Sequence, residues 1–320
     1  MKTVILHIGR QKTGTTSIQS MLTDNRSLLS KYGIWYPDTG RGKKRAHHEL
    51  SMRLNPDQSD NSTYLETRNA FTHELSERPE PLVVVSSEGI QNIKDLSRVS
   101  DLFCGYKLEV VCYLRESLAW KQSAYAQLVH AQRYTGKFYD YAMQVTPNYH
   151  AFCKRWRTVT RKFQERLFER DHLHNGDVVS DFLSHLGLQF SEQDMATLTC
   201  QQENPSLGGN LLYFKLLMNL AHENKPEFFG QYNAFGRLAA SDPRWRQRWY
   251  VSDDDASRIR RVDRDSNNYL RKRFGDFKEV DTTRFPPMPD QATLKEDIAI
   301  ILSDPSLTDA FLPLGLVPAR

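Results

Sequence analysis

The sequence has few cysteines, and their spacing is uninformative for a disulfide or metal framework. Four cysteines stand at positions 104, 112, 153 and 200. They form no C-x-x-C pair and no zinc-like spacing, so we expect reduced thiols in a cytoplasmic protein. His48-Glu49 and His73-Glu74 begin like H-E-x-x-H, but Met52 and Glu77 occupy the position of the second histidine, so no metal site is expected.

Long apolar runs and a strong excess of charge are also lacking. No run approaches the length of a membrane span, and the first residues lack the features of a signal peptide. The net charge is only +4 in 320 residues, and no nucleic-acid motif accompanies the basic clusters. We therefore expect no membrane span and no nucleic-acid partner.

The composition is that of a folded globular protein, with 39% apolar and 26% charged residues. Three short apolar runs predict buried strands at Thr3 to Ile8, Leu82 to Ser86 and Leu108 to Leu114. Segments with helical periodicity alternate with them and then dominate. They are predicted at Ile18 to Leu29, Ser117 to Arg133, Asp177 to Leu186, Leu207 to Leu220 and Ala256 to Phe274.

This pattern predicts an α/β fold, a central parallel β-sheet flanked by helices, with a mainly helical C-terminal half. We predict a single domain over residues 1–320. Residues 1–135 would form a ligand-binding α/β core, and residues 136–320 a mainly helical remainder that completes the fold.

A glycine-bearing loop, Gly9-Arg10-Gln11-Lys12-Thr13-Gly14-Thr15-Thr16-Ser17, follows the first predicted strand and opens a helix. Backbone N–H groups at a helix start bind phosphate or sulfate, and the positive end of the helix dipole adds to this. The hydroxyls of Thr13, Thr15, Thr16 and Ser17 add donors, and Lys12 adds a positive charge. The loop therefore predicts an anion site.

Gly9 and Gly14 have the spacing of a nucleotide-triphosphate P-loop, but Thr15 stands where that motif has its lysine. The lysine precedes Gly14 instead, which argues against a magnesium-dependent kinase or ATPase. A P-loop kinase-like phosphotransferase remains the alternative enzyme, and a non-catalytic adenosine-bisphosphate- or glycan-binding protein remains the alternative outside enzymes.

A second anion-binding element follows the third predicted strand. Arg115 ends that strand, and Ser123 lies eight residues further on, about two turns into the next helix. An arginine at a strand's carboxyl end points into the crevice where open α/β sheets bind ligands. Together the two side chains suit one phosphate group.

With both elements in order, the sequence resembles the sulfotransferases that use 3′-phosphoadenosine 5′-phosphosulfate (PAPS). That family pairs a K-[ST]-G-T-T loop for the 5′-phosphosulfate with an R-x₇-S element for the 3′-phosphate. Lys12 to Thr16 and Arg115 to Ser123 match these elements. The resemblance looks closest to bacterial and carbohydrate-modifying members, and it is looser after Gln127.

The resemblance implies a P-loop-like sulfotransferase fold, PAPS as donor, adenosine 3′,5′-bisphosphate as product, and no required metal. It implies transfer to a hydroxyl of an acceptor, with a saccharide favoured. Donor binding then falls to Arg10, Lys12, Thr13, Gly14, Thr15, Thr16, Ser17, Arg115 and Ser123. Two features depart from the family. Ser17 stands where some relatives have an aromatic side chain that stacks on adenine. The glycine-rich basic loop that covers the 3′-phosphate in some relatives has only a weak counterpart, Arg271 to Lys278.

Sulfuryl transfer to an alcohol needs a group that accepts the hydroxyl proton. Glu88, just past the second predicted strand, is the candidate base, and related carbohydrate sulfotransferases resemble it in placing a glutamate there. His47 or His48 is the rival base, since other branches use histidine. Lys12 would stabilise charge on the bridging oxygen. The basic residues from Arg41 to Arg45 are either acceptor contacts or simply a solvated loop, and aromatics such as Tyr36 and Tyr125 are either sugar contacts or core.

Overall fold

The structure is a computed structural model, and it describes residues 1–42, 44–188, 190–198, 206–222, 231–246, 249–282, 290–311 and 314–315. The chain forms two compact units that interleave along the sequence. Unit 1 comprises residues 1–115, 148–203 and 269–277, and unit 2 comprises residues 116–147, 204–268 and 278–320. The first change from unit 1 to unit 2 thus falls between Arg115 and Glu116, whereas the sequence placed the end of its α/β core at residue 135.

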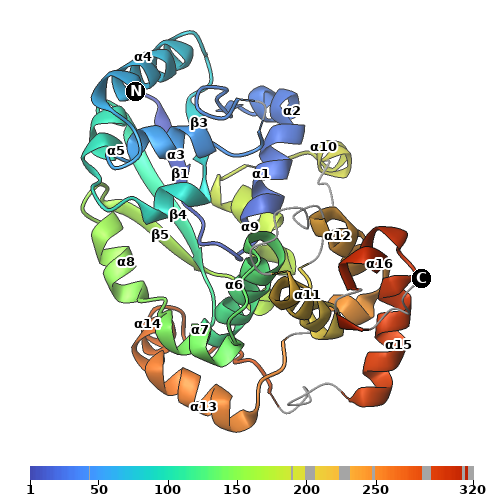
Figure 1. Cartoon of the computed structure of the whole chain (residues 1–320). Helices are drawn as coiled ribbons and strands as arrows, with labels where there is room; N and C mark the ends of the chain where they lie inside the picture. The colour runs from blue at the N-terminus through green and yellow to red at the C-terminus, as the bar shows by residue number, and fades with distance from the viewer. Residues whose placement is uncertain are drawn as a thin grey trace. The chain divides into compact units, whose positions relative to one another are not determined.

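Unit 1 contains a five-stranded sheet in the order β2-β3-β1-β4-β5, in which every neighbouring pair is parallel (Figure 1). The strands are β1 (Thr3–His7), β2 (Ile34–Trp35), β3 (Leu82–Ser86), β4 (Lys107–Leu114) and β5 (Lys162–Leu167). The predicted fold class, a parallel sheet flanked by helices, is confirmed. Because β1 lies between β3 and β4, the segments that follow these three strands emerge at one edge of the sheet.

Both faces of the sheet are buried, because alternate side chains of each strand point to opposite faces. Val4 and Leu6 belong to one apolar cluster, together with residues of α3 (His48–Leu54), α4 (Asn61–Ser76), α5 (Ser97–Leu102) and α8 (Tyr149–Trp156). Ile5 belongs to a second cluster, together with residues of α1 (Thr15–Asp24), α2 (Arg26–Lys31) and α9 (Val178–His185). Helices therefore cover the sheet on two sides, as Figure 1 shows.

Only two helical segments of unit 1 were predicted, Ile18 to Leu29 and Asp177 to Leu186, whereas the described residues of this unit contain eight complete α-helices. They are α1 (Thr15–Asp24), α2 (Arg26–Lys31), α3 (His48–Leu54), α4 (Asn61–Ser76), α5 (Ser97–Leu102), α8 (Tyr149–Trp156), α9 (Val178–His185) and α10 (Glu192–Thr197). The predicted first helix is divided at Asn25, whose side-chain amide donates to the Met21 carbonyl at 2.7 Å. That bond caps the end of α1 with a buried polar group.

Unit 2 is helical over its described residues. It contains α6 (Ser117–Gln132), α7 (Phe138–Gln144), α11 (Gly209–Ala221), α12 (Tyr232–Ser241), α13 (Asp253–Val262), α15 (Gln291–Leu302) and α16 (Pro305–Phe311). Helix α14 (Arg264–Phe274) begins in unit 2 and ends in unit 1. The predicted helix from Ala256 to Phe274 is divided at Asp263, which forms a fully buried ion pair with Lys121 of α6 at 2.6 Å.

Within the described ranges, no helix has both the length and the apolar character needed to cross a membrane. The proposal of one domain over residues 1–320 stays a prediction.

Candidate active site

The loop between β1 and α1 has an unusual backbone. Gly9, Lys12 and Gly14 all have positive φ, at 70°, 65° and 75°. Glycine adopts this left-handed region readily, but lysine rarely does. Gly9 is also sterically required, because a Cβ there would lie 2.7 Å from Thr15 Cγ2 and 3.3 Å from Glu88 Cβ. The sequence therefore folds this loop tightly over the end of β1.

The start of α1 presents backbone donors. The first hydrogen bond of this helix runs from the Ile18 N–H to the Gly14 carbonyl at 3.2 Å. The N–H groups of Thr15 and Thr16 precede it and have no acceptor within the helix. Thr16 is exposed, so this helix start is open to solvent. It is the arrangement that binds phosphate or sulfate oxygens.

The predicted hydroxyl donors divide into two kinds. Thr13 is fully buried and donates to the Arg10 carbonyl at 2.5 Å, which braces the loop. Thr15 is buried and donates to Glu88 Oε2 at 2.8 Å. Thr16 is exposed and Ser17 half-buried. The structure thus favours Thr16 and Ser17 over Thr13 and Thr15 for direct contact with an anion.

Gly14 is covered by two apolar side chains that the sequence did not single out. A Cβ at Gly14 would lie 2.8 Å from Val178 Cγ1 and 2.9 Å from Phe168 Cε2. Val178 begins α9, and Phe168 directly follows β5. Prediction of β5 would have pointed to Phe168, since the residue after a strand lies at the binding edge of the sheet.

Arg115 lies against the same loop. Its Nη1 donates to the Lys12 carbonyl at 3.1 Å, and its guanidinium lies 5.5 Å from the centroid of the Phe168 ring. The Tyr149 hydroxyl donates to the Arg115 carbonyl at 2.5 Å. The structure therefore brings Arg115 and Lys12 together, and the bond from Arg115 helps hold Lys12 in its left-handed conformation.

Glu88 follows β3, and Arg115 follows β4. Because β3 and β4 lie on opposite sides of β1, the two residues flank the loop after β1 from opposite sides. It begins a 3₁₀ turn, Glu88–Asn92, whose preceding residue Ser87 accepts from the Gly89 N–H at 3.3 Å. The half-buried Glu88 carboxylate is fixed by the hydroxyl of Thr15. The ends of β1, β3 and β4 thus bring together the loop, the candidate base and Arg115.

The two histidines occupy different environments. His47 is fully buried; its Nδ1 accepts from the Ser86 N–H at 3.2 Å and its Nε2 lies 3.1 Å from the Pro37 carbonyl. Burial lowers the pKa of His47 to about 4. His48 is half-buried, and its Nδ1 lies 3.3 Å from the Ser87 hydroxyl, beside Glu88. This geometry favours His48 over His47 as the alternative base.

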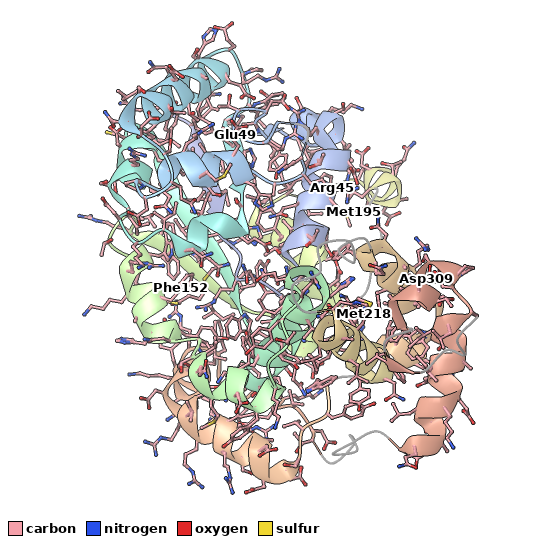
Figure 2. All side chains as sticks on the ribbon, in the orientation of Figure 1. Arg45, Glu49, Phe152, Met195, Met218 and Asp309 are labelled. Atoms are coloured by element: carbon pink, nitrogen blue, oxygen red, sulfur yellow. The ribbon has the colours of Figure 1, made fainter. Side chains whose placement is uncertain are left out.

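Arg10 contacts two aromatic rings of α8. Its guanidinium lies 5.3 Å from the centroid of Tyr149 and 4.8 Å from that of Phe152, a side chain that Figure 2 labels. Arg155, also on α8, donates to the Gln91 carbonyl at 2.7 Å. Burial, and then the charge of Arg10, lower the pKa of Arg155. No sequence motif indicated this second arginine near the loop.

Comparisons with known proteins give matches among solved structures alone. The chain is similar to a sulfotransferase of known structure. That protein, from Alicyclobacillus acidocaldarius, is 19% identical, with a TM-score of 0.42 over 76% of this chain and 97% of its own. A retinol dehydratase in a complex with retinol and PAP is 14% identical, with a TM-score of 0.37 over 88% and 84%. A structure of the PezAT toxin–antitoxin system of Streptococcus pneumoniae is 14% identical, with a TM-score of 0.29 over 69% and 87%.

No protein-family model matches the chain, and a search of curated proteins gives no match. The geometry of the site is therefore the basis for a function. Ser123 belongs to unit 2, where it is half-buried on α6. Its proposed role at the 3′-phosphate stays a prediction.

Two basic side chains of the loop before α3 form contacts within the protein. Arg41 is buried and pairs with Asp38. Arg45, which Figure 2 labels, donates to Ser20 Oγ of α1 at 2.7 Å. Lys44 is exposed, and Lys43 lies outside the described residues. Tyr36 and Tyr125, considered as sugar contacts, are buried core residues. Over the described ranges, no three His, Cys, Asp or Glu side chains are grouped to hold a metal ion.

Proposed function

We propose that this chain transfers the sulfuryl group of PAPS to a hydroxyl of an acceptor, and that the acceptor is a carbohydrate. One relationship carries the proposal: the Lys12 loop is joined to Glu88 through Thr15 and to Arg115 through the Lys12 carbonyl. A cation, an open helix start and a carboxylate thus meet at adjacent strand ends. These are the groups that in-line transfer to an alcohol requires.

In this reaction the acceptor oxygen attacks sulfur while the bond from sulfur to the bridging phosphate oxygen breaks. Glu88 takes the proton of the acceptor hydroxyl. The electron pair of the broken bond remains on the phosphate of adenosine 3′,5′-bisphosphate, and Lys12 stabilises that negative charge. Positioning and electrostatics account for such a reaction, as they do for phosphoryl transfer.

The residues at the loop fit the donor. The backbone N–H groups at the start of α1 and the hydroxyl of the exposed Thr16 suit the 5′-phosphosulfate. Arg115, a fork-shaped donor, suits a phosphate. We assign the 3′-phosphate to Arg115 and Ser123, and we expect no metal requirement. We also place the reaction in the cytoplasm, in line with the free thiols of Cys104, Cys112 and Cys153.

The experiment that tests the donor site is calorimetric titration with adenosine 3′,5′-bisphosphate. Parallel titrations use adenosine 5′-phosphate, which lacks the 3′-phosphate, and magnesium-ATP. We expect tight binding of the bisphosphate alone. Preference for magnesium-ATP would favour the kinase alternative, and absence of binding to all three would overturn the proposed donor site.

Transfer itself needs a second measurement, since a binding protein without activity would pass the first. Purified protein is incubated with PAPS labelled with ³⁵S and a panel of oligosaccharides, with and without a metal chelator. We expect labelled saccharide that forms equally in the presence of the chelator. Tight bisphosphate binding without labelled product from any acceptor would support the non-catalytic alternative.

A further inference from the structure

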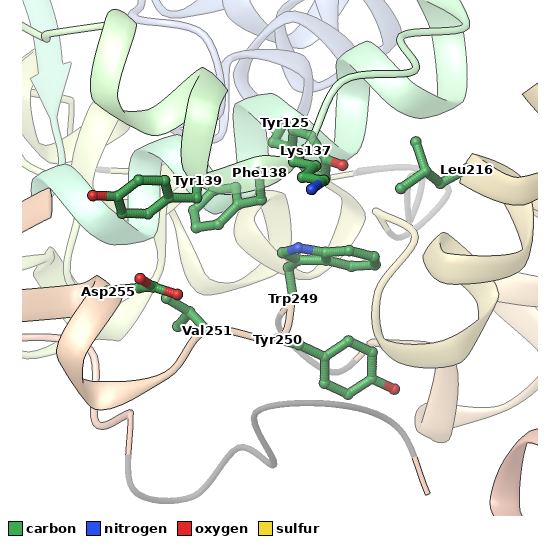
Figure 3. A pocket seen from close by; sticks show the side chains of 9 residues that line it. All are labelled: Tyr125, Lys137, Phe138, Tyr139, Leu216, Trp249, Tyr250, Val251 and Asp255. Carbon is green, nitrogen blue, oxygen red and sulfur yellow. The ribbon is translucent and has the colours of Figure 1, made fainter. Parts of the chain in front are cut away.

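Unit 2 contains a pocket whose lining includes none of the proposed donor-binding residues. Its cavity volume is about 190 Å³, and its lining comes from α6, the start of α7 with the residue before it, α11, the segment before α13 and the first turn of α13. Figure 3 shows the ring of Trp249 among the lining side chains, with Lys137 and Asp255 on different sides of it in this view. All lining residues belong to unit 2.

Aromatic rings form most of the wall, and they support one another. The Trp249 ring lies 5.6 Å from Tyr125 and 5.4 Å from Tyr250, and Tyr125 lies 5.3 Å from Phe138. The backbone of Trp249 is also fixed, because Gln122 of α6 donates to its carbonyl at 3.0 Å. Trp249 is nevertheless half-buried, so it combines a fixed position with an accessible surface.

The tyrosine hydroxyls of the pocket are already hydrogen-bonded to the protein. Tyr125 donates to the Gly136 carbonyl at 2.9 Å, and Tyr250 donates to Asn210. The hydroxyl of Tyr139 is hydrogen-bonded to Arg258. The half-buried Tyr139 and Tyr250 therefore offer a ligand mainly their ring carbons, which pack against apolar C–H surface. Tyr125 is fully buried and contributes by packing against the Trp249 ring.

Two charged side chains at the pocket differ from these tyrosines. Lys137 is exposed and Asp255 half-buried. Neither side chain makes an ion pair or a hydrogen bond with another described residue. The pocket thus adds a free cation and a free carboxylate to its aromatic wall, so a ligand with hydroxyl groups and a negative charge complements it.

The volume limits the ligand to about one ring. A cavity of about 150 Å³ holds a single benzene ring, so one of about 190 Å³ holds one substituted six-membered ring but not a fused tetracycle. A pyranose meets each requirement: its C–H face packs on Trp249, its hydroxyls donate to Asp255, and a carboxylate substituent pairs with Lys137.

We propose that this pocket binds one uronic acid residue of an acidic saccharide. The identification of this saccharide as the acceptor rests on the proposed sulfuryl transfer. Its binding to the pocket does not depend on that proposal. The two claims are separable, because donor binding and saccharide binding can be titrated independently in the same protein.

The experiment titrates the full chain with a disaccharide of glucuronate and N-acetylglucosamine, and with its neutral counterpart in which glucose replaces glucuronate. We expect the acidic disaccharide to bind more tightly. Lys137→Gln should weaken its binding about tenfold and leave the neutral disaccharide within about twofold. Lys295→Gln, which removes an exposed lysine of α15 in the same unit, should change neither affinity.

Trp249→Ala should abolish saturable binding of both disaccharides, and its melting curve reports whether unit 2 remains folded. Because removal of this ring can also unfold the unit, the charge preference measured with Lys137→Gln decides the matter. Equal affinity of wild type and Lys137→Gln for the acidic disaccharide would overturn the proposal, as would tighter binding of 1-naphthol than of either sugar. Saccharide binding without bisphosphate binding would support the proposed pocket and contradict the proposed function. Bisphosphate binding without saccharide binding would support the donor site and contradict the proposed pocket.

Discussion

The hydroxyl of Thr15 donates to Glu88 Oε2 at 2.8 Å, so the helix that opens the anion-binding loop also orients the candidate base. The contact joins the segments that follow β1 and β3, two strands that are adjacent in the sheet. A base fixed in this way is held in place before any acceptor arrives. Such pre-organisation favours proton transfer at the moment of attack.

Replacing Glu88 with glutamine tests the base directly. The amide of the new side chain keeps an oxygen that accepts from Thr15, but it cannot take up a proton at neutral pH. We expect kcat to fall by about 10²- to 10⁴-fold, while the Kd for adenosine 3′,5′-bisphosphate stays within about twofold. Glu49→Gln, on the exposed side of α3, is the matched control and should retain full activity. A near-normal rate in Glu88→Gln would move the assignment to His48.

Lys12 is expected to act on the rate more than on acceptor binding. Both Lys12→Ala and Lys12→Gly should lower kcat by about 10²-fold or more, because charge on the leaving phosphate oxygen is then less stabilised. The backbone of Lys12 has φ of 65°, which glycine tolerates better than alanine. Lys12→Gly should therefore be at least as stable as Lys12→Ala in urea unfolding. If acceptor KM rose while kcat held, Lys12 would be a binding residue instead.

Arg115 and Ser123 are predicted to recognise the 3′-phosphate. Ser123→Ala should weaken binding of adenosine 3′,5′-bisphosphate about fivefold and leave adenosine 5′-phosphate unaffected. Arg115→Ala should abolish transfer and weaken both nucleotides, because the arginine also holds the Lys12 carbonyl. Calorimetry with the two nucleotides separates these effects, and Arg161→Ala, an exposed site after α8, is the control. Equal loss for both nucleotides in Ser123→Ala would contradict the assignment.

The sheet could be predicted only where its strands are buried on both faces. β1, β3 and β4 are rich in Val, Ile and Leu and were predicted to within one residue at each end. β5, with the sequence KFQERL, has polar or charged residues at four of its six positions and lies at the edge of the sheet, so no apolar run marks it. Its buried Glu165 is stabilised by Arg273 at 2.7 Å, a partner 108 residues away that no local pattern reveals.

The same contrast holds for the site. The loop from Gly9 to Ser17 was recognisable because its residues are contiguous. The bond from Thr15 to Glu88 spans 73 residues and that from Arg115 to Lys12 spans 103, so both depend on the sheet order. The neighbours His47 and His48 could not be told apart in the sequence. In the structure His47 is fully buried and His48 half-buried, and the backbone N–H of His47 donates to the Ser86 carbonyl at 2.9 Å.

The burial of His47 predicts a loss of stability in mild acid. Its pKa is lowered from 6.5 to about 4, first by burial and with a further contribution from the charge of Arg41. The unfolded chain therefore binds a proton more readily than the folded one between these values. The stabilisation is complete above pH 6.5 and is lost as the pH falls toward 4.

Between pH 7 and pH 5 this histidine should cost the folded state about 2 kcal/mol. The free energy of unfolding in urea, measured at both pH values, gives the wild-type difference. In His47→Gln the difference should be smaller by about that amount, whatever the variant's stability at pH 7. His48→Gln is the control for the loss of a neighbouring imidazole ring. An unchanged pH dependence in His47→Gln would mean that the ring takes up its proton without disturbing the contacts to Ser86 and Pro37, and it would restore His47 beside His48 as a candidate base.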